Sequence, residues 1–229
     1  MKISGLQKLT LLDFPDVVSC IVFTKGCNLR CPFCHNSSLV VDSKLTPEID
    51  EEEVFSYLNK RKNILDGVVI SGGEPLLQSD IKDFIVRIKT LGYKVKLDTN
   101  GVNSKLLSEL IDEKLVDYVA MDIKNTFDKY DMTTGKSNSR IDNIKESIRI
   151  LKKEKVPYEF RTTIVKNFHN IEDIKKILKY INGSKYFIQN FVDNENTIKK
   201  GLIGFTKDEL ININDELKKD FTNFKIREL

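Results

Sequence analysis

The stretch Ser19–Asn36 reads SCIVFTKGCNLRCPFCHN and joins an apolar run to a cysteine-rich segment. Its first six residues, Ser19–Thr24, are largely apolar and rich in strand-forming types, which predicts a buried β-strand. After this run come Cys27, Cys31 and Cys34 in a C-x3-C-x2-C pattern. Thiols at these spacings converge on one metal centre only from a loop. We therefore expect a metal site where this strand ends.

Similar short runs recur along the chain and alternate with helical patterns. Further strands are expected at Gly67–Ser71, Lys94–Asp98, Asp117–Asp122, Tyr158–Ile164 and Tyr186–Gln189, with Phe224–Arg227 as an edge strand. Helices are expected at Ile49–Lys60, Asp80–Leu91, Ser104–Glu113, Ile141–Lys155, Ile171–Ile181 and Lys207–Lys218. Six such units predict an α/β fold with a parallel sheet, either open or curled into an incomplete relative of the eight-unit barrel. In both arrangements, functional sites lie at the carboxyl ends of the strands.

The composition limits the classes of protein to which the chain can belong. Its 229 residues suit a single domain, 1–229, and 40% hydrophobic with 31% charged residues is typical of a globular protein. No apolar run reaches the ~20 residues of a membrane span, and the start of the chain has no secretory signal. The basic stretch Lys145–Lys155 also carries Glu146 and Glu154, which is typical of a solvated helix face. We expect a cytoplasmic protein that binds neither nucleic acid nor membrane.

The clustered cysteines leave two interpretations open, an iron–sulfur cluster and a structural zinc ion. Three thiolates leave one iron of a [4Fe–4S] cluster open to bind a small chelating ligand, because such clusters normally take four thiolates. A structural zinc ion would need His35 as its fourth ligand, but His35 directly follows Cys34 and could hardly close a tetrahedron. Cys20 lies inside the apolar run, roughly 23 Å from the cluster cysteines if the chain is extended, and is expected to be a buried, inert thiol.

The second predicted strand ends in Ser71-Gly72-Gly73-Glu74-Pro75. Two glycines at a strand end let the backbone approach a ligand closely. Exposed carbonyl groups together with Glu74 would suit an ammonium group. A plain turn is the alternative interpretation.

Charged residues also mark the ends of the next three strands. Asp98 and Asp122 are two carboxylates at neighbouring strand ends, which favours a cation or ribose hydroxyls nearby. Arg161 lies among apolar residues of the fifth strand, where an unpaired charge is costly. Its partner is either a ligand carboxylate or one of the two aspartates.

At these residues the chain resembles the radical S-adenosylmethionine (radical SAM) superfamily, through the cysteine pattern and Gly-Gly-Glu-Pro. It is more closely similar to the activating enzymes of glycyl-radical enzymes, and in particular to those of anaerobic ribonucleoside-triphosphate reductase. The matching segments are Leu12–Pro15, Phe23–Cys27, Cys34–Asn36, Leu97–Gly101 and Met121–Lys124, with Gly5–Lys8 and Pro157–Thr163 for the reductase activators.

The resemblance implies a partial (β/α)6 barrel of the radical SAM type and a role for each matching residue. It implies that Cys27, Cys31 and Cys34 bind the [4Fe–4S] cluster and that S-adenosylmethionine caps the open iron. The expected S-adenosylmethionine contacts are Phe33, Cys34, His35, Gly72, Gly73, Glu74, Asp98, Thr99, Asn100, Asp122, Lys124 and Arg161. Asp98, Thr99, Met121 and Asp122 also resemble a monovalent-cation site.

The resemblance further implies an oxidoreductase of anaerobic metabolism. It would cleave S-adenosylmethionine reductively to a 5′-deoxyadenosyl radical and install a glycyl radical on a partner, the anaerobic ribonucleotide reductase, using electrons from a flavodoxin- or ferredoxin-type reductant. Two departures from the family pattern concern this partner. The chain has Asp16 after Pro15, where activators often have Gly. It also has no His in Ile188–Val192, where pyruvate formate-lyase activators carry a His after the sixth strand. Two alternatives stay open: a radical SAM enzyme for a small molecule or peptide, and a non-enzymatic iron–sulfur or zinc module.

Overall fold

A computed structural model describes residues 1–41 and 46–227 of the chain. Its described strands form one sheet in which each strand pairs with the next along the chain, in the order β1 to β8. The strands are β1 (Ile3–Thr10), β2 (Ser19–Thr24), β3 (Gly67–Gly72), β4 (Lys94–Thr99), β5 (Tyr118–Asp122), β6 (Tyr158–Ile164), β7 (Tyr186–Asn190) and β8 (Phe224–Ile226). β1 runs antiparallel to β2, and all later neighbours are parallel. The expected α/β fold with a partial barrel is confirmed.

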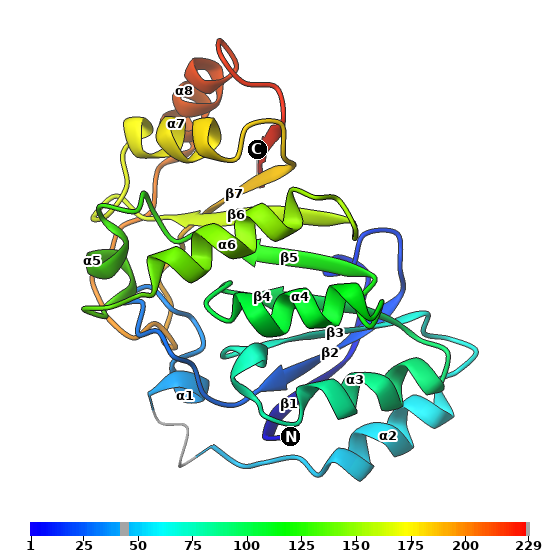
Figure 1. Cartoon of the computed structure of the whole chain (residues 1–229). Helices are drawn as coiled ribbons and strands as arrows, with labels where there is room; N and C mark the ends of the chain where they lie inside the picture. Colours follow the sequence, from blue (N-terminus) through cyan, green and yellow to red (C-terminus); the bar gives the residue numbers. More distant parts are fainter. Residues whose placement is uncertain (42–45, 228–229) are drawn as a thin grey trace.

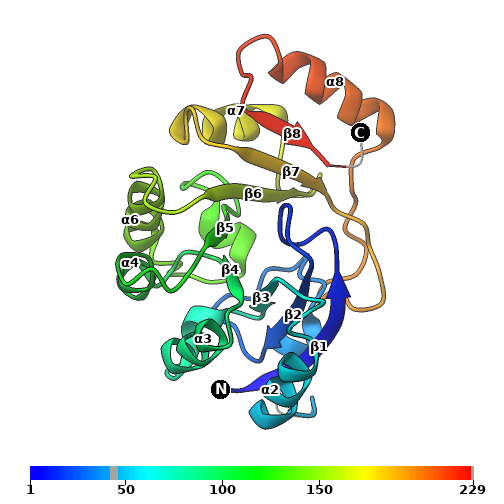
Figure 2. The ribbon, with the colours of Figure 1, turned by 90° about the vertical axis from the view of Figure 1, so that its right-hand side faces the viewer.

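Most helices cover the outer face of this curved sheet, as Figure 1 shows for α2, α3, α4, α6 and α7. The helices are α1 (Ser37–Val40), α2 (Glu51–Lys60), α3 (Ile81–Thr90), α4 (Ser104–Asp112), α5 (Tyr130–Thr134), α6 (Ile141–Leu151), α7 (Ile171–Tyr180) and α8 (Lys207–Leu217), with a short 3₁₀ helix at Pro75–Leu77. Turned by 90°, the strands follow an open arc with β1 and β8 at its two ends (Figure 2). The sheet is therefore a barrel wall that does not close.

The predicted elements agree with this architecture to within a few residues, but the sequence reading missed β1. The segment Ile3–Thr10 reads ISGLQKLT, and its glycine and exposed Gln7 and Lys8 lack the apolar density of the inner strands. It forms a strand because its backbone pairs with β2, which is a tertiary contact that local propensity does not report. The short helices α1 and α5 were also missed, and isolated helices of this length have little intrinsic stability.

The parallel register brings the functional strand ends to one rim. Thr24 of β2 pairs with Gly72 of β3, and Asp122 of β5 pairs with Arg161 of β6. Since β2 to β7 all point the same way, the segments that follow them gather at this rim.

Three groups of buried apolar side chains hold the fold. The largest lies between the sheet and the outer helices and includes Cys20, Val22 and Ile70. On the opposite face of the sheet, Ile21, Val69 and Tyr118 pack inside the barrel against Phe14 of the loop between β1 and β2. A small third group lies under the cysteine loop and consists of Leu29, Cys31, Phe33, Val165, Phe191 and Leu202.

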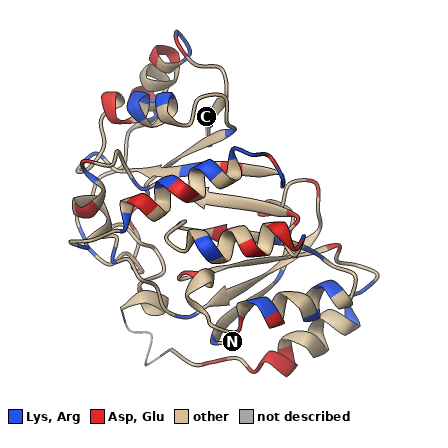
Figure 3. Cartoon of the chain, viewed as in Figure 1, with Lys and Arg blue, Asp and Glu red and all other residues tan. Residues whose placement is uncertain are grey.

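Charges of both signs are interspersed along the outer helices. Helix α6, for example, carries basic and acidic residues side by side (Figure 3), and Arg149 pairs with Glu146 on it. This is the mixed helix face expected for the Lys145–Lys155 stretch. None of the helices in the described part of the chain combines the length and apolar character needed to cross a membrane.

Helix α7 begins with a reciprocal cap, and this gives a test of the fold. The Asn170 side chain accepts a hydrogen bond from the Asp173 backbone N–H, and Asp173 accepts one from the Asn170 N–H. Asn170→Ala should lower the free energy of unfolding by about 1 kcal/mol, whereas Asn170→Ser should retain most of it because serine is also a good cap. Urea unfolding followed by circular dichroism measures both. Equal losses in the two variants would contradict the role of the cap.

Candidate functional site

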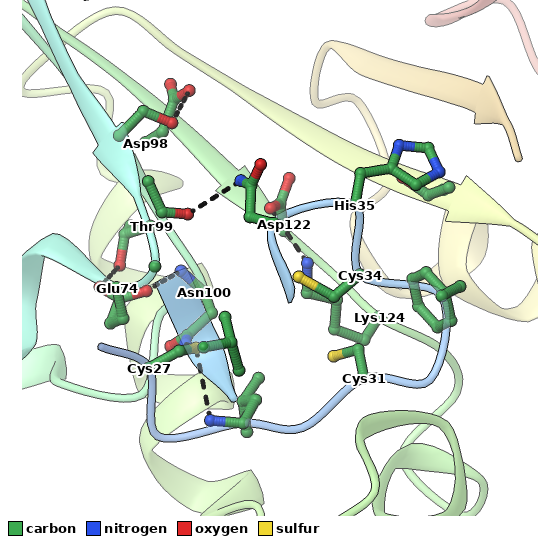
Figure 4. A pocket seen from close by; sticks show the side chains of 18 of the residues that line it. Cys27, Cys31, Cys34, His35, Glu74, Asp98, Thr99, Asn100, Asp122 and Lys124 are labelled. Carbon is green, nitrogen blue, oxygen red and sulfur yellow. Dashed lines mark hydrogen bonds and ion pairs between the residues drawn. The ribbon is translucent and has the colours of Figure 1, made fainter. Parts of the chain in front are cut away.

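The three expected cluster ligands lie on one loop that follows β2. Backbone hydrogen bonds fix this loop on several sides: Gly26 N–H donates to Leu39 O at 2.8 Å, and Arg30 N–H donates to Thr134 O at 2.9 Å. Its second half is held from the other end of the chain, where Lys199 N–H donates to Pro32 O at 2.8 Å. Cys27, Cys31 and Cys34 line one cavity and none of them forms a disulfide. Cys31 and Cys34 stand at the two ends of one turn of the loop, in which Cys34 N–H donates to Cys31 O at 3.0 Å (Figure 4).

The two other candidate ligands from the sequence, His35 and Cys20, do not join the three thiols. The His35 ring packs against Phe191, with ring centroids 5.3 Å apart, and lies apart from the thiols in Figure 4. Cys20 is fully buried in the outer core, and burial raises the pKa of its thiol to about 12. This is the placement expected of an inert core thiol. Within residues 1–41 and 46–227, no set of three or more His, Cys, Asp or Glu side chains closes around a single metal ion.

The thiols fit a multi-iron cluster better than a single ion. They line a shared cavity, and no group of three or more His, Cys, Asp or Glu side chains in the described part of the chain is placed to hold a single ion. Burial raises the pKa of Cys27 to about 11 and that of Cys31 to about 12. Since metal binding needs thiolates, the protein must gain metal to deprotonate these groups at neutral pH. The donor set therefore suits three irons of a [4Fe–4S] cluster.

Gly72 and Gly73 at the end of β3 allow a close approach of other atoms, as expected. The atoms that approach them are those of the protein backbone, whereas the sequence predicted a ligand. A Cβ atom on Gly73 would lie 1.9 Å from the carbonyl oxygen of Gly26, and one on Gly72 would lie 2.4 Å from the backbone nitrogen of Thr24. Gly72 also has a φ of +111°, which side-chain-bearing residues rarely adopt. Both glycines line the cavity. What they make room for in this structure is the start of the cysteine loop.

Glu74 links the ends of β3 and β4. Its carboxylate accepts hydrogen bonds from Thr99 Oγ1 at 2.7 Å, the Asn100 N–H at 2.7 Å and the Leu76 N–H at 3.1 Å. Burial raises the pKa of Glu74 to about 7, against the opposing effect of these donors. Asn100 in turn donates to Asn28 Oδ1 at 2.8 Å, beside Cys27. The carboxylate thus orders the rim, and protein donors already occupy it.

Arg161 pairs with both aspartates, as one of the sequence alternatives proposed. Its Nε donates to Asp122 Oδ1 at 3.0 Å, and its Nη1 lies 3.4 Å from Asp98 Oδ2. Lys124 Nζ lies 3.1 Å from Asp122 Oδ2. Burial alone would raise the pKa of Asp122, but Arg161 and Lys124 hold it at about 2. These residues form a paired charge network on one wall of the cavity.

The cavity collects the expected residues from the ends of four strands, β3 to β6, and from the cysteine loop. The residues that the sequence reading singled out and that line it are Cys27, Cys31, Phe33, Cys34, His35, Gly72, Gly73, Glu74, Asp98, Thr99, Asn100, Asp122, Lys124 and Arg161. Met121 is the exception, because its side chain is fully buried against Gly101. The reading missed Ser71 and Thr163, which line the same cavity. Thr163 lies two residues beyond Arg161 and so shares its strand face, a signal that alternation along β6 could have supplied.

One residue behind the cavity wall was also missed. His169 is buried, and its Nε2 lies 2.8 Å from the carbonyl oxygen of Lys124. Its Nδ1 accepts a hydrogen bond from the Val165 N–H at 3.1 Å. Nε2 is therefore the donor, and it holds the turn that follows β5.

Comparison with known proteins shows independently to which family the chain is similar. The family model of the radical SAM superfamily matches residues 21–181. A Methanocaldococcus jannaschii protein named as a glycyl-radical enzyme activating enzyme is 39% identical over 194 residues, which are 82% of this chain and 79% of that protein. The pyruvate formate-lyase-activating enzyme of Clostridium pasteurianum is 28% identical over 226 residues, or 95% of this chain and 89% of that enzyme.

Solved structures agree on the fold. A radical SAM methyltransferase from Sphaerobacter thermophilus superposes with a TM-score of 0.71 at 13% identity, over 96% of this chain and 68% of that one. Streptococcus suis SuiB bound to S-adenosylmethionine gives a TM-score of 0.66 at 16% identity, over 90% of this chain. The chain spans about half the length of SuiB, 51%, so this likeness concerns the shared barrel.

The separation of Cys20 from the other thiols gives a direct test of the ligand set. Cys31→Ala should abolish cluster assembly, whereas Cys20→Ala should keep about four iron and four sulfide per chain, the content of one [4Fe–4S] cluster. Iron and sulfide analysis after anaerobic reconstitution measures both. Loss of iron binding in a folded Cys20→Ala protein would contradict the three-thiolate site.

The contact between Gly73 and Gly26 predicts a second effect. Gly73→Ala should displace the cysteine loop and so reduce iron content, because the added methyl would overlap the Gly26 carbonyl. Gly183→Ala is the control, since a Cβ there meets no atom within 4 Å and brings only the strain of its positive φ. Full iron loading of Gly73→Ala would show that the loop does not depend on this contact.

Sequence pattern, site and relatives agree. Three thiols and the rim residues of neighbouring strands share one cavity. The family model covers most of the chain, and a relative above 30% identity is named for glycyl-radical activation. The chain therefore belongs to the radical SAM superfamily, whose members use a [4Fe–4S] cluster and S-adenosylmethionine, and within it to the activating enzymes of glycyl-radical enzymes.

Proposed function

We propose that this enzyme installs a glycyl radical on an anaerobic ribonucleoside-triphosphate reductase. The segments Gly5–Lys8 and Pro157–Thr163 support this partner, because they resemble the reductase activators. The relatives named for pyruvate formate-lyase support the same reaction on a different partner. Both enzyme classes would receive the radical on a backbone glycine.

The cavity at the rim carries the proposal. Cys27, Cys31 and Cys34 would hold the cluster from one side, while the ends of β3 to β6 would meet S-adenosylmethionine from the other. When bound, these cofactors supply the radical chemistry that removes a hydrogen atom from the partner's glycine, and the protein supplies orientation and exclusion of water. The partly buried Lys124 and Arg161 would offer positive charge to the carboxylate of S-adenosylmethionine.

The segment 125–140 supports a protein substrate over a small molecule. It packs against the cysteine loop: Thr134 O accepts from the Arg30 N–H, and a Cβ on Gly135 would lie 2.4 Å from Arg30 O. Asn125 is tied to Thr133 and Phe168. With this segment serving as a support for the loop, a partner surface is the natural cover for the barrel. A flavodoxin- or ferredoxin-type protein would supply the electron.

The test uses the reconstituted enzyme with S-adenosylmethionine, a chemical reductant and one of two partners under anaerobic conditions. We expect a doublet EPR signal with the anaerobic ribonucleotide reductase, and none when the reductase's radical-bearing glycine is changed to Ala. Cys31→Ala enzyme is the matched control without the cluster. A signal with pyruvate formate-lyase alone would overturn the choice of partner. Rapid turnover of a free metabolite without either partner would overturn glycyl-radical activation as the reaction.

A further inference from the structure

The inner wall of the barrel carries a buried lysine behind the cavity. Val95 and Leu97 of β4 face the outer core, so the residue between them, Lys96, faces the barrel interior. The Lys96 side chain is only 2% exposed, and its Nζ forms an ion pair with Asp98 Oδ1. Lys96 does not line the cavity itself, but Asp98 does. The ammonium therefore reaches the cavity wall through this carboxylate.

Both oxygens of Asp98 are occupied. Oδ1 pairs with Lys96, while Oδ2 accepts from Ser71 Oγ at 3.1 Å and lies 3.4 Å from Arg161 Nη1. Burial would raise the pKa of Asp98, but Arg161 and Lys96 keep it below its usual value. Asp98 is therefore ionised and fully paired at neutral pH.

The charge balance around the two aspartates is already positive. Within the part of the chain that the structure describes, Asp98 and Asp122 are contacted by three cationic groups, from Lys96, Lys124 and Arg161. Two carboxylates against three cations leave one net positive charge among these contacts, and the exposed fractions of the five side chains lie between 2% and 30%. Like charges repel strongly where water cannot screen them.

These contacts do not fit the monovalent-cation site expected at Asp98, Thr99, Met121 and Asp122. A bound potassium or sodium ion needs oxygen ligands, but Thr99 Oγ1 already donates to Glu74 and accepts from the Gly101 N–H, and both Asp98 oxygens have donors. The ion would also raise the local charge from one positive to two. The ammonium of Lys96 neutralises the Asp98 carboxylate, which is what such an ion would do.

We propose that Lys96 is a built-in counter-cation for Asp98, and that this enzyme therefore binds S-adenosylmethionine without potassium or sodium ions. Lys96 acts as a positioning residue: it holds Asp98, and Asp98 in turn holds the guanidinium of Arg161 at the cavity wall. This inference concerns the cofactor site of the family and does not depend on which partner receives the radical.

The first test uses the unaltered, cluster-loaded protein. Its S-adenosylmethionine dissociation constant is measured by isothermal titration calorimetry in choline chloride, potassium chloride and sodium chloride at equal ionic strength. We expect values within about twofold of one another, a difference near RT ln 2. A dissociation constant about tenfold lower in potassium or sodium than in choline would overturn the proposal.

The second test removes the charge. Lys96→Met keeps the length of the side chain but leaves Asp98 one cation short, so binding should weaken about tenfold or more in choline and recover when potassium is added. Lys94→Met is the matched control, because Lys94 lies two residues earlier on the same strand and is exposed. It should behave like the parent in every salt.

Thermal unfolding of the cluster-free proteins adds a readout that needs neither cofactor nor activity. Potassium should raise the midpoint of Lys96→Met relative to choline and leave the parent and Lys94→Met unchanged. A folded Lys96→Met protein with no response to potassium in either measurement would overturn the proposal. If Lys96→Met fails to fold, the salt series on the parent still decides it.

Discussion

The backbone contact between β3 and the cysteine loop is the constraint on which the site depends. Gly73 N–H donates to Thr24 O at 2.9 Å and Glu74 N–H donates to Gly26 O at 2.8 Å, so the end of β3 lies directly against the start of the loop. No side chain fits between them. From this contact, Glu74 reaches the end of β4 and Asn100 reaches back to Asn28. The position of the first thiol is thus set by a closed chain of backbone and side-chain bonds, which is the kind of support that a precise site needs.

The other wall of the cavity depends on charge. Burying an ion pair rarely adds stability, because the cost of removing two charges from water is close to what their attraction returns. The network of Lys96, Asp98, Arg161 and Asp122 therefore fixes orientation more than it stabilises the fold. Every member faces the inside of the barrel from a different position on β4, β5 or β6. Such a set of oriented charges in a water-poor interior requires little rearrangement when a zwitterionic ligand binds.

Most of the fold could be predicted from the sequence because the short runs of strand-forming residues in β2 to β7 alternate with helical patterns. β1 could not, since it owes its structure to pairing with β2. The residue types of the site were also readable, because ligand-forming side chains follow predictable strands. The groups that these side chains contact were harder to predict. The orientation of His35 depends on Phe191, which is distant in sequence, and the pattern at Gly72 and Gly73 signalled a close approach without saying that the approaching group was Gly26.

An incomplete barrel leaves two strands with unpaired backbone groups, and such strands are templates for uncontrolled pairing with other chains. In this protein both edge strands, β1 and β8, are short or irregular. β8 spans only Phe224–Ile226, and the pairing of β1 with β2 is broken by register shifts between Ile3 and Gly5 and between Gln7 and Thr10. Neither margin offers a long, regular row of donors and acceptors. The margins of the sheet therefore favour a polypeptide that enters as a loop, recognised by side chains and shape, over one that adds a further strand.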